Sequence, residues 1–367
     1  MGKLSGIRVV DLSMFLPGPM LSLMLADQGA EVIKVEPPAG DPARTQGPFA
    51  GHQGIRHSIW FANLNRGKAS VVLDLKTPDG KAALADLVRG ADVFIEGFRP
   101  GVMARLGFGW DAVHALNPRI IYCSLSAFGQ AGALADHPAH DMAVQALAGF
   151  LSVNDAGDGR PAVPGVPASD VAAGLTGLAA VLMALIGRER TGQGDHIDIA
   201  MFDSLLPWGA HIAGSALAGG PAPTSADQRS LGGAAFYNVY TCADGRHIVL
   251  GGREVKFARS LLGALGRPDL VPLAQAEAGA PQAPLIAFLR ETFATRSRAE
   301  WEVFMADLDV AFAPVLDFAE ALAAPHVAQR GLVVEDAGIP QIAPPIRFAS
   351  DPPWLPGHVP GLGEGRP

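Results

Sequence analysis

The sequence is poor in charged and aromatic residues. Charged residues make up 17% and aromatic residues 7% of the 367 residues, whereas apolar residues make up 49%. This composition excludes intrinsic disorder, because a disordered chain has too few apolar side chains to bury. Positive charge is also scarce, with 28 Lys and Arg against 36 Asp and Glu and a formal net charge of −8. No nucleic-acid partner is expected, because binding to phosphates needs clustered Lys and Arg.

Cysteine is nearly absent. Only Cys123 and Cys242 occur, which excludes a disulfide framework and a four-cysteine zinc site. The first residues contain no apolar signal segment. The most apolar long stretch, residues 171–186, is too short to cross a membrane comfortably and fits a buried helix better. We expect a soluble cytoplasmic protein without a membrane partner.

Several widespread cofactor and catalytic motifs are missing. No Gly-x-Gly-x-x-Gly follows the first expected strand, which disfavours nicotinamide and flavin cofactors. There is no phosphate-binding loop of the Walker type, no Gly-x-Ser-x-Gly and no His-Glu-x-x-His. His137 and His140 have the spacing of a metal-binding pair but lack further ligands nearby, so no metal is expected.

The chain does contain a regular alternation of β-branched runs and helical patterns. Strands are expected at 7–12, 31–36, 70–75, 93–96 and 119–124, and helices at 20–28, 78–89, 140–149 and 170–188. This order predicts a doubly wound α/β domain with a parallel sheet. Residues 38–69 are expected to form a long loop that is functional or covers something.

The residue pattern changes in the second half of the chain. Residues 219–232 lack periodicity and predict a linker. Two runs that flank Asp244-Gly245 predict a hairpin, and helical patterns follow near 254–265, 284–295 and 298–308. We therefore expect a large α/β domain in residues 1–218, a small α+β domain in 233–310, and a return to the large domain in 311–367.

Nine segments carry a resemblance to a known family. They are residues 4–12 (LSGIRVVDL), 17–19 (PGP), 29–37 (GAEVIKVEP), 65–76 (NRGKASVVLDLK), 92–101 (DVFIEGFRPG), 126–130 (SAFGQ), 163–170 (VPGVPASD), 188–194 (RERTGQG) and 201–204 (MFDS). In this order they resemble the class III CoA-transferase family of the CaiB/BaiF type, which includes formyl-CoA transferases and α-methylacyl-CoA racemases. The resemblance implies an acyl-CoA substrate, a Rossmann-like large domain that binds CoA, and an interlocked homodimer.

Asp170 is the first candidate catalytic residue. It precedes a long helical pattern, where an aspartate often serves as an N-cap. The resemblance matches it to the central aspartate of the family. In transferases this residue attacks the thioester, and in racemases it is one of two acid/base groups.

His140, Asp141 and Glu254 are the other candidate catalytic residues. Racemases of the family carry Gly-His-Asp where this chain has Ala139-His140-Asp141. Histidine exchanges protons near neutral pH, whereas Asp141 is expected to organise local hydrogen bonds. The resemblance assigns Glu254 to support of the catalytic histidine; a helix-start glutamate explains it equally well.

CoA needs cations for its phosphates and an apolar slot for adenine. The resemblance places Arg99, Arg105 and Phe98 near CoA. Further candidates are Lys34, Arg66, Lys68 and Lys76, although surface charge is the commoner role of such residues. Leu16 stands where oxalate- and formate-handling transferases have glutamine, which favours an uncharged acyl chain.

Three functions remain open: two different reactions, and binding of CoA without catalysis. The favoured one is racemisation, a 1,1-proton transfer at the carbon beside the thioester by His140 and Asp170, with oxyanion donors from the start of the Asp170 helix. The alternative is CoA transfer between carboxylic acids, with Asp170 as covalent nucleophile. Ala143-Val144 depart from the racemase pattern, and Asn65-Arg-Gly-Lys68 is more typical of transferases.

Overall fold

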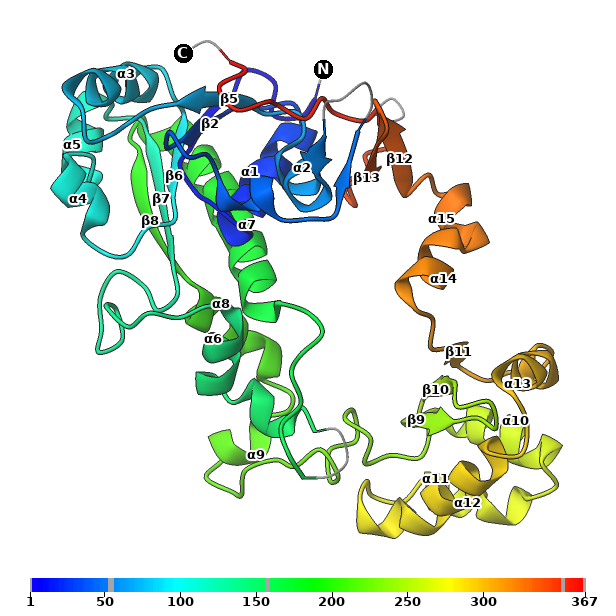
Figure 1. The fold of residues 1–367 in the computed structure, drawn as a ribbon. Coiled ribbons are helices and arrows are strands. Elements are labelled where there is room, and N and C mark those ends of the chain that lie inside the picture. The colour runs from blue at the N-terminus through cyan, green and yellow to red at the C-terminus, as the bar shows by residue number, and fades with distance from the viewer. Residues whose placement is uncertain (1, 52–55, 156–158, 351–353, 366–367) are drawn as a thin grey trace. The chain divides into compact units, whose positions relative to one another are not determined.

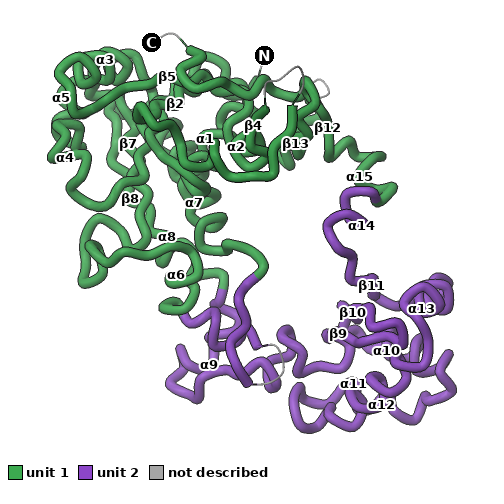
Figure 2. The backbone as a smooth tube through the Cα atoms, viewed as in Figure 1, with its two compact units in different colours: residues 1–148, 165–208, 324–367 green, residues 149–164, 209–323 purple. Residues whose placement is uncertain are grey.

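The computed structural model describes residues 2–51, 56–155, 159–350 and 354–365. The chain divides into two compact units (Figure 2). Unit 1 combines residues 1–148, 165–208 and 324–367, and unit 2 combines 149–164 and 209–323. The domain ranges inferred from the sequence stay a prediction.

Unit 1 is built on a six-stranded parallel sheet in the order β5-β2-β1-β6-β7-β8 (Figure 1). Each neighbouring pair is parallel, as the βαβ pattern predicts. The sheet contains β1 (Arg8–Asp11), β2 (Glu31–Glu36), β5 (Ala69–Val72), β6 (Val93–Glu96), β7 (Ile121–Ser126) and β8 (Asp195–Ala200). The last strand, β8, was not expected from the sequence.

Helices cover both faces of this sheet. One face packs against α1 (Pro17–Asp27) and α7 (Ala168–Thr191), and this layer holds Leu21, Leu25 and Val181 in its core. The other face packs against α3 (Pro78–Arg89), α4 (Val102–Leu106) and α5 (Trp110–Leu116), with Leu84 and Phe94 buried between them. The predicted doubly wound α/β architecture is confirmed.

Two helices begin earlier than expected. The sequence placed a break at Pro17-Gly18-Pro19, but α1 starts at Pro17, because proline lacks only an N–H that the first helical turn leaves unbonded anyway. Helix α7 has 24 residues and starts at Ala168. By length and composition alone it could cross a membrane, with a mean hydropathy of 1.9 in its most apolar window. Its buried face packs in the core of unit 1.

The segment expected as a long loop is partly regular. Residues 38–69 contain a 3-10 turn (Pro42–Thr45), β3 (Phe49–Ala50), β4 (His57–Ser58) and α2 (Ile59–Asn65). Phe61 and Ala62 of α2 form a small core with Ile339 and Val359. Thus the last part of the chain covers this segment, with β12 (Val333–Asp336) and β13 (Ile339–Ile342) forming a hairpin.

Unit 2 contains the predicted hairpin, β9 (Tyr237–Thr241) and β10 (His247–Gly251). Strand β11 (Phe312–Pro314) pairs with β10, and unit 2 extends to Ala323. Helices α10 (Val255–Ala264), α12 (Ala283–Phe293) and α13 (Arg298–Met305) pack on this sheet around Leu261 and Trp301.

The other helices of the described residues are short. Unit 2 also contains α9 (Gly214–Leu217), α11 (Val271–Ala274) and α14 (Phe318–Ala323). Unit 1 also contains α6 (Asp141–Leu147), α8 (Met201–Leu205) and α15 (Pro325–Gln329).

Candidate active site

A cavity of about 550 Å³ opens in unit 1 at the carboxyl ends of the parallel strands. Its wall comes from residues 13–15, 17 and 18 after β1, 97–100 after β6 and 125–127 at the end of β7, together with α6 and α7. The sheet order reverses between β1 and β6. Open α/β sheets bind their ligands at such a switch point, so the topology and the cavity indicate the same place.

Asp170 lines this cavity. It is the third residue of α7, whose N-cap is Pro167, so its interpretation as an N-cap is wrong. Burial and the nearby charge of Asp141 raise the pKa of Asp170 to about 7. Both causes disfavour the carboxylate, and such a perturbed acid in a cavity is a candidate for chemistry.

Asp141 caps the helix of Asp170 from outside. Its Oδ1 accepts hydrogen bonds from the backbone N–H of Ser169 at 2.8 Å and of Asp170 at 3.3 Å. The Ser169 hydroxyl donates to the same oxygen at 2.6 Å, and Gln145 Nε2 donates to Oδ2 at 2.7 Å. These contacts confirm that Asp141 organises local hydrogen bonds and fix where α7 starts.

The same contacts correct the expected source of oxyanion donors. The backbone N–H groups of Ser169 and Asp170 are bonded to Asp141, and that of Val171 donates to Pro167 O at 3.1 Å. The start of α7 therefore has no spare donor at these positions for a thioester oxygen.

His140 lies on the cavity wall with Asp170. It is the N-cap of α6, and its ring meets the Phe15 ring edge-on, with centroids 6.4 Å apart. Phe15 has a φ of +64°, a backbone conformation that non-glycine residues adopt rarely. Phe15 and Pro17 line the cavity, whereas Leu16 is not among its described lining residues, so the argument from Leu16 against a charged acid loses its basis.

Residues 13 and 18, at the two ends of the loop that carries Phe15, are in close contact. A Cβ on Gly18 would lie 2.1 Å from the Ser13 hydroxyl oxygen. Ser13 in turn is buried and hydrogen-bonded to Asp11. Residue 18 therefore has room for glycine only, which gives the Pro-Gly-Pro motif a steric reason.

Four of the CoA candidates are placed where a ligand could reach them. Phe98 and Arg99 line the cavity, and Arg105 and Lys76 have exposed side chains. His137, Met142 and Met201 also line the cavity. Neither methionine was assigned to the site from the sequence, since a methionine side chain gives no signal beyond that of a core residue.

The other cationic candidates are buried. Lys34 and Lys68 have no exposed side-chain surface, and Arg66 pairs with Asp27 at 2.9 Å. A CoA phosphate cannot reach the ammonium groups, so the structure does not support a direct contact of Lys34 or Lys68 with CoA. Arg66 is 3% exposed and lies over the Trp354 ring, which likewise leaves its guanidinium little access.

Glu254 lies in unit 2, as the N-cap of α10 and without a capping hydrogen bond from its side chain. Its expected support of His140 stays a prediction. Among the described residues, no group of three or more His, Cys, Asp or Glu side chains could hold a metal ion.

Comparisons with known proteins identify the family. The family model described as CoA-transferase family III matches residues 4–366. The chain belongs to this family. It is 37% identical to an acetyl-CoA:oxalate CoA-transferase of Acetobacter aceti, over 99% of this chain and 94% of that protein.

Two further relatives agree with the family. A succinate–glutarate CoA-transferase of Agrobacterium fabrum is 36% identical, over 98% of this chain and 93% of that protein. A crystal structure of a CaiB/BaiF family protein from Brucella suis superposes with a TM-score of 0.86, at 32% identity and over 99% of this chain and 97% of that one. The Acetobacter and Agrobacterium proteins are both named as CoA-transferases. They therefore favour CoA transfer, the alternative reaction, over racemisation.

Proposed function

We propose that the protein transfers CoA between carboxylic acids with Asp170 as covalent nucleophile. The observation that carries this proposal is the half-buried Asp170 in a cavity at the switch point of the sheet. The transferase activities named for its relatives supply the reaction class. A carboxylate removed from water is a stronger nucleophile than a hydrated one, and a pKa near 7 leaves a large fraction ionised at neutral pH.

The reaction needs only the chain's own carboxylate and the two substrates. The Asp170 carboxylate attacks the thioester carbon, the C–S bond breaks, and CoA leaves as thiolate while an acyl-aspartyl anhydride forms. The thiolate then attacks the Asp170 carbonyl, releases the first acid as carboxylate and gives an aspartyl-CoA thioester. The acceptor acid repeats these two steps in reverse order, which restores the Asp170 carboxylate and yields the new acyl-CoA.

The proposed CoA-binding residues are Phe98 and Arg99, which line the cavity, and the exposed Arg105 and Lys76. The relatives named above act on oxalate and on glutarate, so dicarboxylic acids are the first acceptors to test. A cytoplasmic location and an interlocked homodimer remain part of this proposal.

Trapping the intermediate tests the proposal. After incubation with acetyl-CoA or succinyl-CoA, mass spectrometry should find a CoA or acyl mass on the peptide with Asp170, and hydroxylamine should remove it. His140→Phe should keep this adduct, because transfer needs no proton carrier at residue 140. The test includes acetyl, succinyl and α-methyl-branched donors, so that a missing adduct is not caused by one unsuitable acyl group.

Racemisation is the second candidate, because His140 and Asp170 line the same cavity. It predicts that an α-methyl-branched acyl-CoA gains one deuterium in D₂O while Asp170 stays unmodified. His140→Ala would then stop the exchange. Deuterium uptake without any adduct, in the wild-type protein, would contradict the transferase proposal.

The pH profile gives a separate prediction. Because only the carboxylate attacks, kcat/KM for acyl-CoA should fall as the pH drops below about 7, the pKa of Asp170 in the free protein. Asp141→Asn removes one of the two causes of the raised pKa, so the acidic limb should move to lower pH. It should stay above the range of an ordinary aspartate, because burial is the larger cause. Asp86→Asn, on the exposed side of α3, is the matched control and should leave the profile unchanged.

A further inference from the structure

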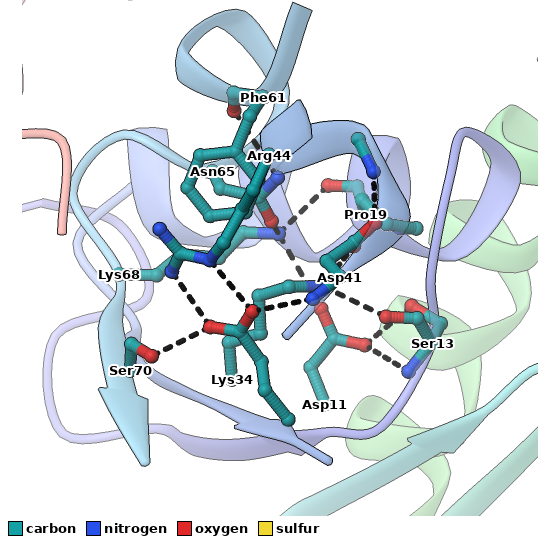
Figure 3. A network of polar contacts seen from close by, with 12 residues as sticks. Asp11, Ser13, Pro19, Lys34, Asp41, Arg44, Phe61, Asn65, Lys68 and Ser70 are labelled. Atoms are coloured by element: carbon teal, nitrogen blue, oxygen red, sulfur yellow. Dashed lines mark hydrogen bonds and ion pairs between the residues drawn. The ribbon is translucent and has the colours of Figure 1, made fainter. Parts of the chain in front are cut away.

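Lys34 is a fully buried lysine whose ammonium group meets the backbone of Ser13 (Figure 3). Its Nζ donates to the backbone oxygen of Ser13 at 2.8 Å and lies 2.8 Å from Asp41 Oδ2. Asp41 is itself buried, and its other oxygen accepts from the backbone N–H of Ala43 at 2.9 Å. The ammonium group of Lys34 thus fixes one carbonyl of a residue that lines the cavity.

Lys68 binds the chain directly after this wall, in the first turn of α1 (Figure 3). Its Nζ donates to the backbone oxygen of Pro19 at 3.0 Å, to Ser22 Oγ at 2.7 Å and to Asn65 Oδ1 at 2.9 Å. Asp11 Oδ2 lies 3.4 Å away. All side chains in this group are buried. The Asn65 and Lys68 of the Asn-Arg-Gly-Lys motif therefore act inside the protein.

Asp11 joins the two lysine sites. Its Oδ1 accepts from the backbone N–H of Ser13 at 2.9 Å and from the Ser13 hydroxyl. The N–H of Ser13 is thus bonded to Asp11 and its carbonyl to Lys34. Both polar groups of this peptide segment point inward to buried charges, which leaves residues 14, 15, 17 and 18 to face the cavity.

The cavity wall also packs closely against α7, the helix that carries Asp170. A Cβ on Gly174 would lie 3.0 Å from the backbone oxygen of Pro17. Gly174 lies four residues after Asp170 on α7, hence about one turn along the same helix. A shift of the wall would therefore change the space next to Asp170.

Stability alone does not explain two buried ammonium groups here. Well-packed apolar side chains often stabilise a fold as much as buried ion pairs do, since the pairs lose their hydration. An apolar side chain at residue 34 would, however, leave the Ser13 carbonyl without its Lys34 donor, and a buried unpaired carbonyl is unfavourable. The Ser13 carbonyl would turn toward the cavity, where water or ligand can bind it. An apolar side chain at residue 68 would leave Pro19 O with the Ser22 hydroxyl at 3.3 Å and would loosen the contact of α2 with the first turn of α1.

We propose that Lys34 and Lys68 are positioning residues, which fix the two ends of the segment 13–19 so that its cavity-lining part holds the acyl-CoA thioester against Asp170. The role in catalysis rests on the proposed CoA transfer. Neither lysine touches the substrate: Lys34 acts through the Ser13 carbonyl of the wall and Lys68 through the Pro19 carbonyl directly after the wall.

Charge-neutral double variants separate positioning from stability. Lys34→Met with Asp41→Asn, and Lys68→Met with Asp11→Asn, each remove a cation together with its anion, so no unpaired buried charge remains. The amide introduced by Asp41→Asn keeps an oxygen for the Ala43 N–H, and the amide introduced by Asp11→Asn keeps one for the Ser13 N–H. Lys81→Met on α3, whose side chain is partly exposed, is the control for the loss of one lysine.

Three measurements are made on each purified full-length variant: thermal unfolding, steady-state kinetics, and hydrogen exchange of the peptide that covers residues 13–19. We expect unfolding close to that of the wild type, faster exchange in this peptide alone, and a fall of kcat by about 100-fold, since a displacement of about 1 Å can have this effect. Lys81→Met should match the wild type in all three.

The outcomes of this experiment are distinguishable. Unchanged exchange at residues 13–19 together with unchanged kcat would overturn the positioning role. Activity that falls only in proportion to lost folded protein would mean a structural role and would overturn it too. A wild-type protein that forms no Asp170 adduct contradicts the proposed function, while the exchange measurement still decides whether the two lysines fix the wall.

Discussion

Replacement of Asp170 by asparagine is expected to remove CoA transfer almost completely. Asparagine keeps the size of the side chain and its place in the first turn of α7, but an amide does not attack a thioester to form an anhydride. Loss of a covalent nucleophile lowers kcat by about 10³-fold or more. Steady-state kinetics with an acyl-CoA donor and a dicarboxylic acceptor measure the loss, and the mass of the variant after incubation should show no adduct.

The same substitution should stabilise the fold above pH 7. The pKa of Asp170 is about 7 in the folded protein against an ordinary value of 3.8, so the folded state binds the proton more tightly than the unfolded chain. Stability therefore falls as the pH rises from about 4 to about 7, and stays low above that range. At about 1.4 kcal/mol per pKa unit, the carboxylate destabilises the fold at pH 8 by at most about 4 kcal/mol.

Thermal unfolding at pH 4 and pH 8 checks that Asp170→Asn loses activity while it gains stability above pH 7. Asp170→Asn should raise Tm at pH 8 and have little effect on it at pH 4. An inactive variant with a lower Tm at pH 8 would mean that activity was lost with the fold. A variant that keeps CoA transfer would refute the assignment of Asp170 as nucleophile.

Gly18→Ala is expected to have the second largest effect. The new Cβ would overlap Ser13, with 2.1 Å to its Oγ and 2.2 Å to its Cβ, so the wall of residues 13–18 must move. Overpacking of this kind destabilises by about 1–3 kcal/mol. Because this wall lines the cavity of Asp170, we expect CoA transfer to fall by about 100-fold.

A second substitution tests the steric cause. Gly18→Ala combined with Ser13→Gly removes the overlapping atoms, and the next nearest atom, Ser13 Cα, is at an ordinary 3.7 Å. The double variant should recover part of the lost stability and activity, although it lacks the hydrogen bond from the Ser13 hydroxyl to Asp11. Ser13→Gly alone is the control. Equal losses with and without Ser13→Gly would show that crowding is not the reason for glycine at residue 18.

The sheet could be predicted from the sequence because its signals are local. The runs at 31–36 and 93–96 alternate with a helical pattern at 78–89, and β2, α3 and β6 have these bounds. Strand β8 gave no such signal, since its six residues Asp195–Ala200 include three polar ones and most are not buried. Its place is set by pairing with β7.

The cavity was harder to predict than its central aspartate. Asp170 could be assigned by resemblance, and the structure places it with His140 and Arg99 around one cavity. Lys34 was expected near CoA because the phosphates of CoA need cations. A lysine inside a buried parallel strand was the signal to the contrary, because such strands are continuously apolar unless a charge is paired. Its partners Ser13 and Asp41 lie in loops whose approach depends on the tertiary fold.

The cover of α2 by the end of the chain has a consequence for biosynthesis. Asn63 Oδ1 accepts the N–H of Ile342, 279 residues further on, and Phe61 shares its small core with Ile339 and Val359. At roughly 5–20 residues per second, a ribosome needs roughly 14–56 s to make the intervening chain. During that time Phe61 is covered by Ala43 and Arg44 but lacks the contacts of Ile339 and Val359. The exposed part of this small core must therefore avoid association with other nascent chains until residues 339–359 have been made.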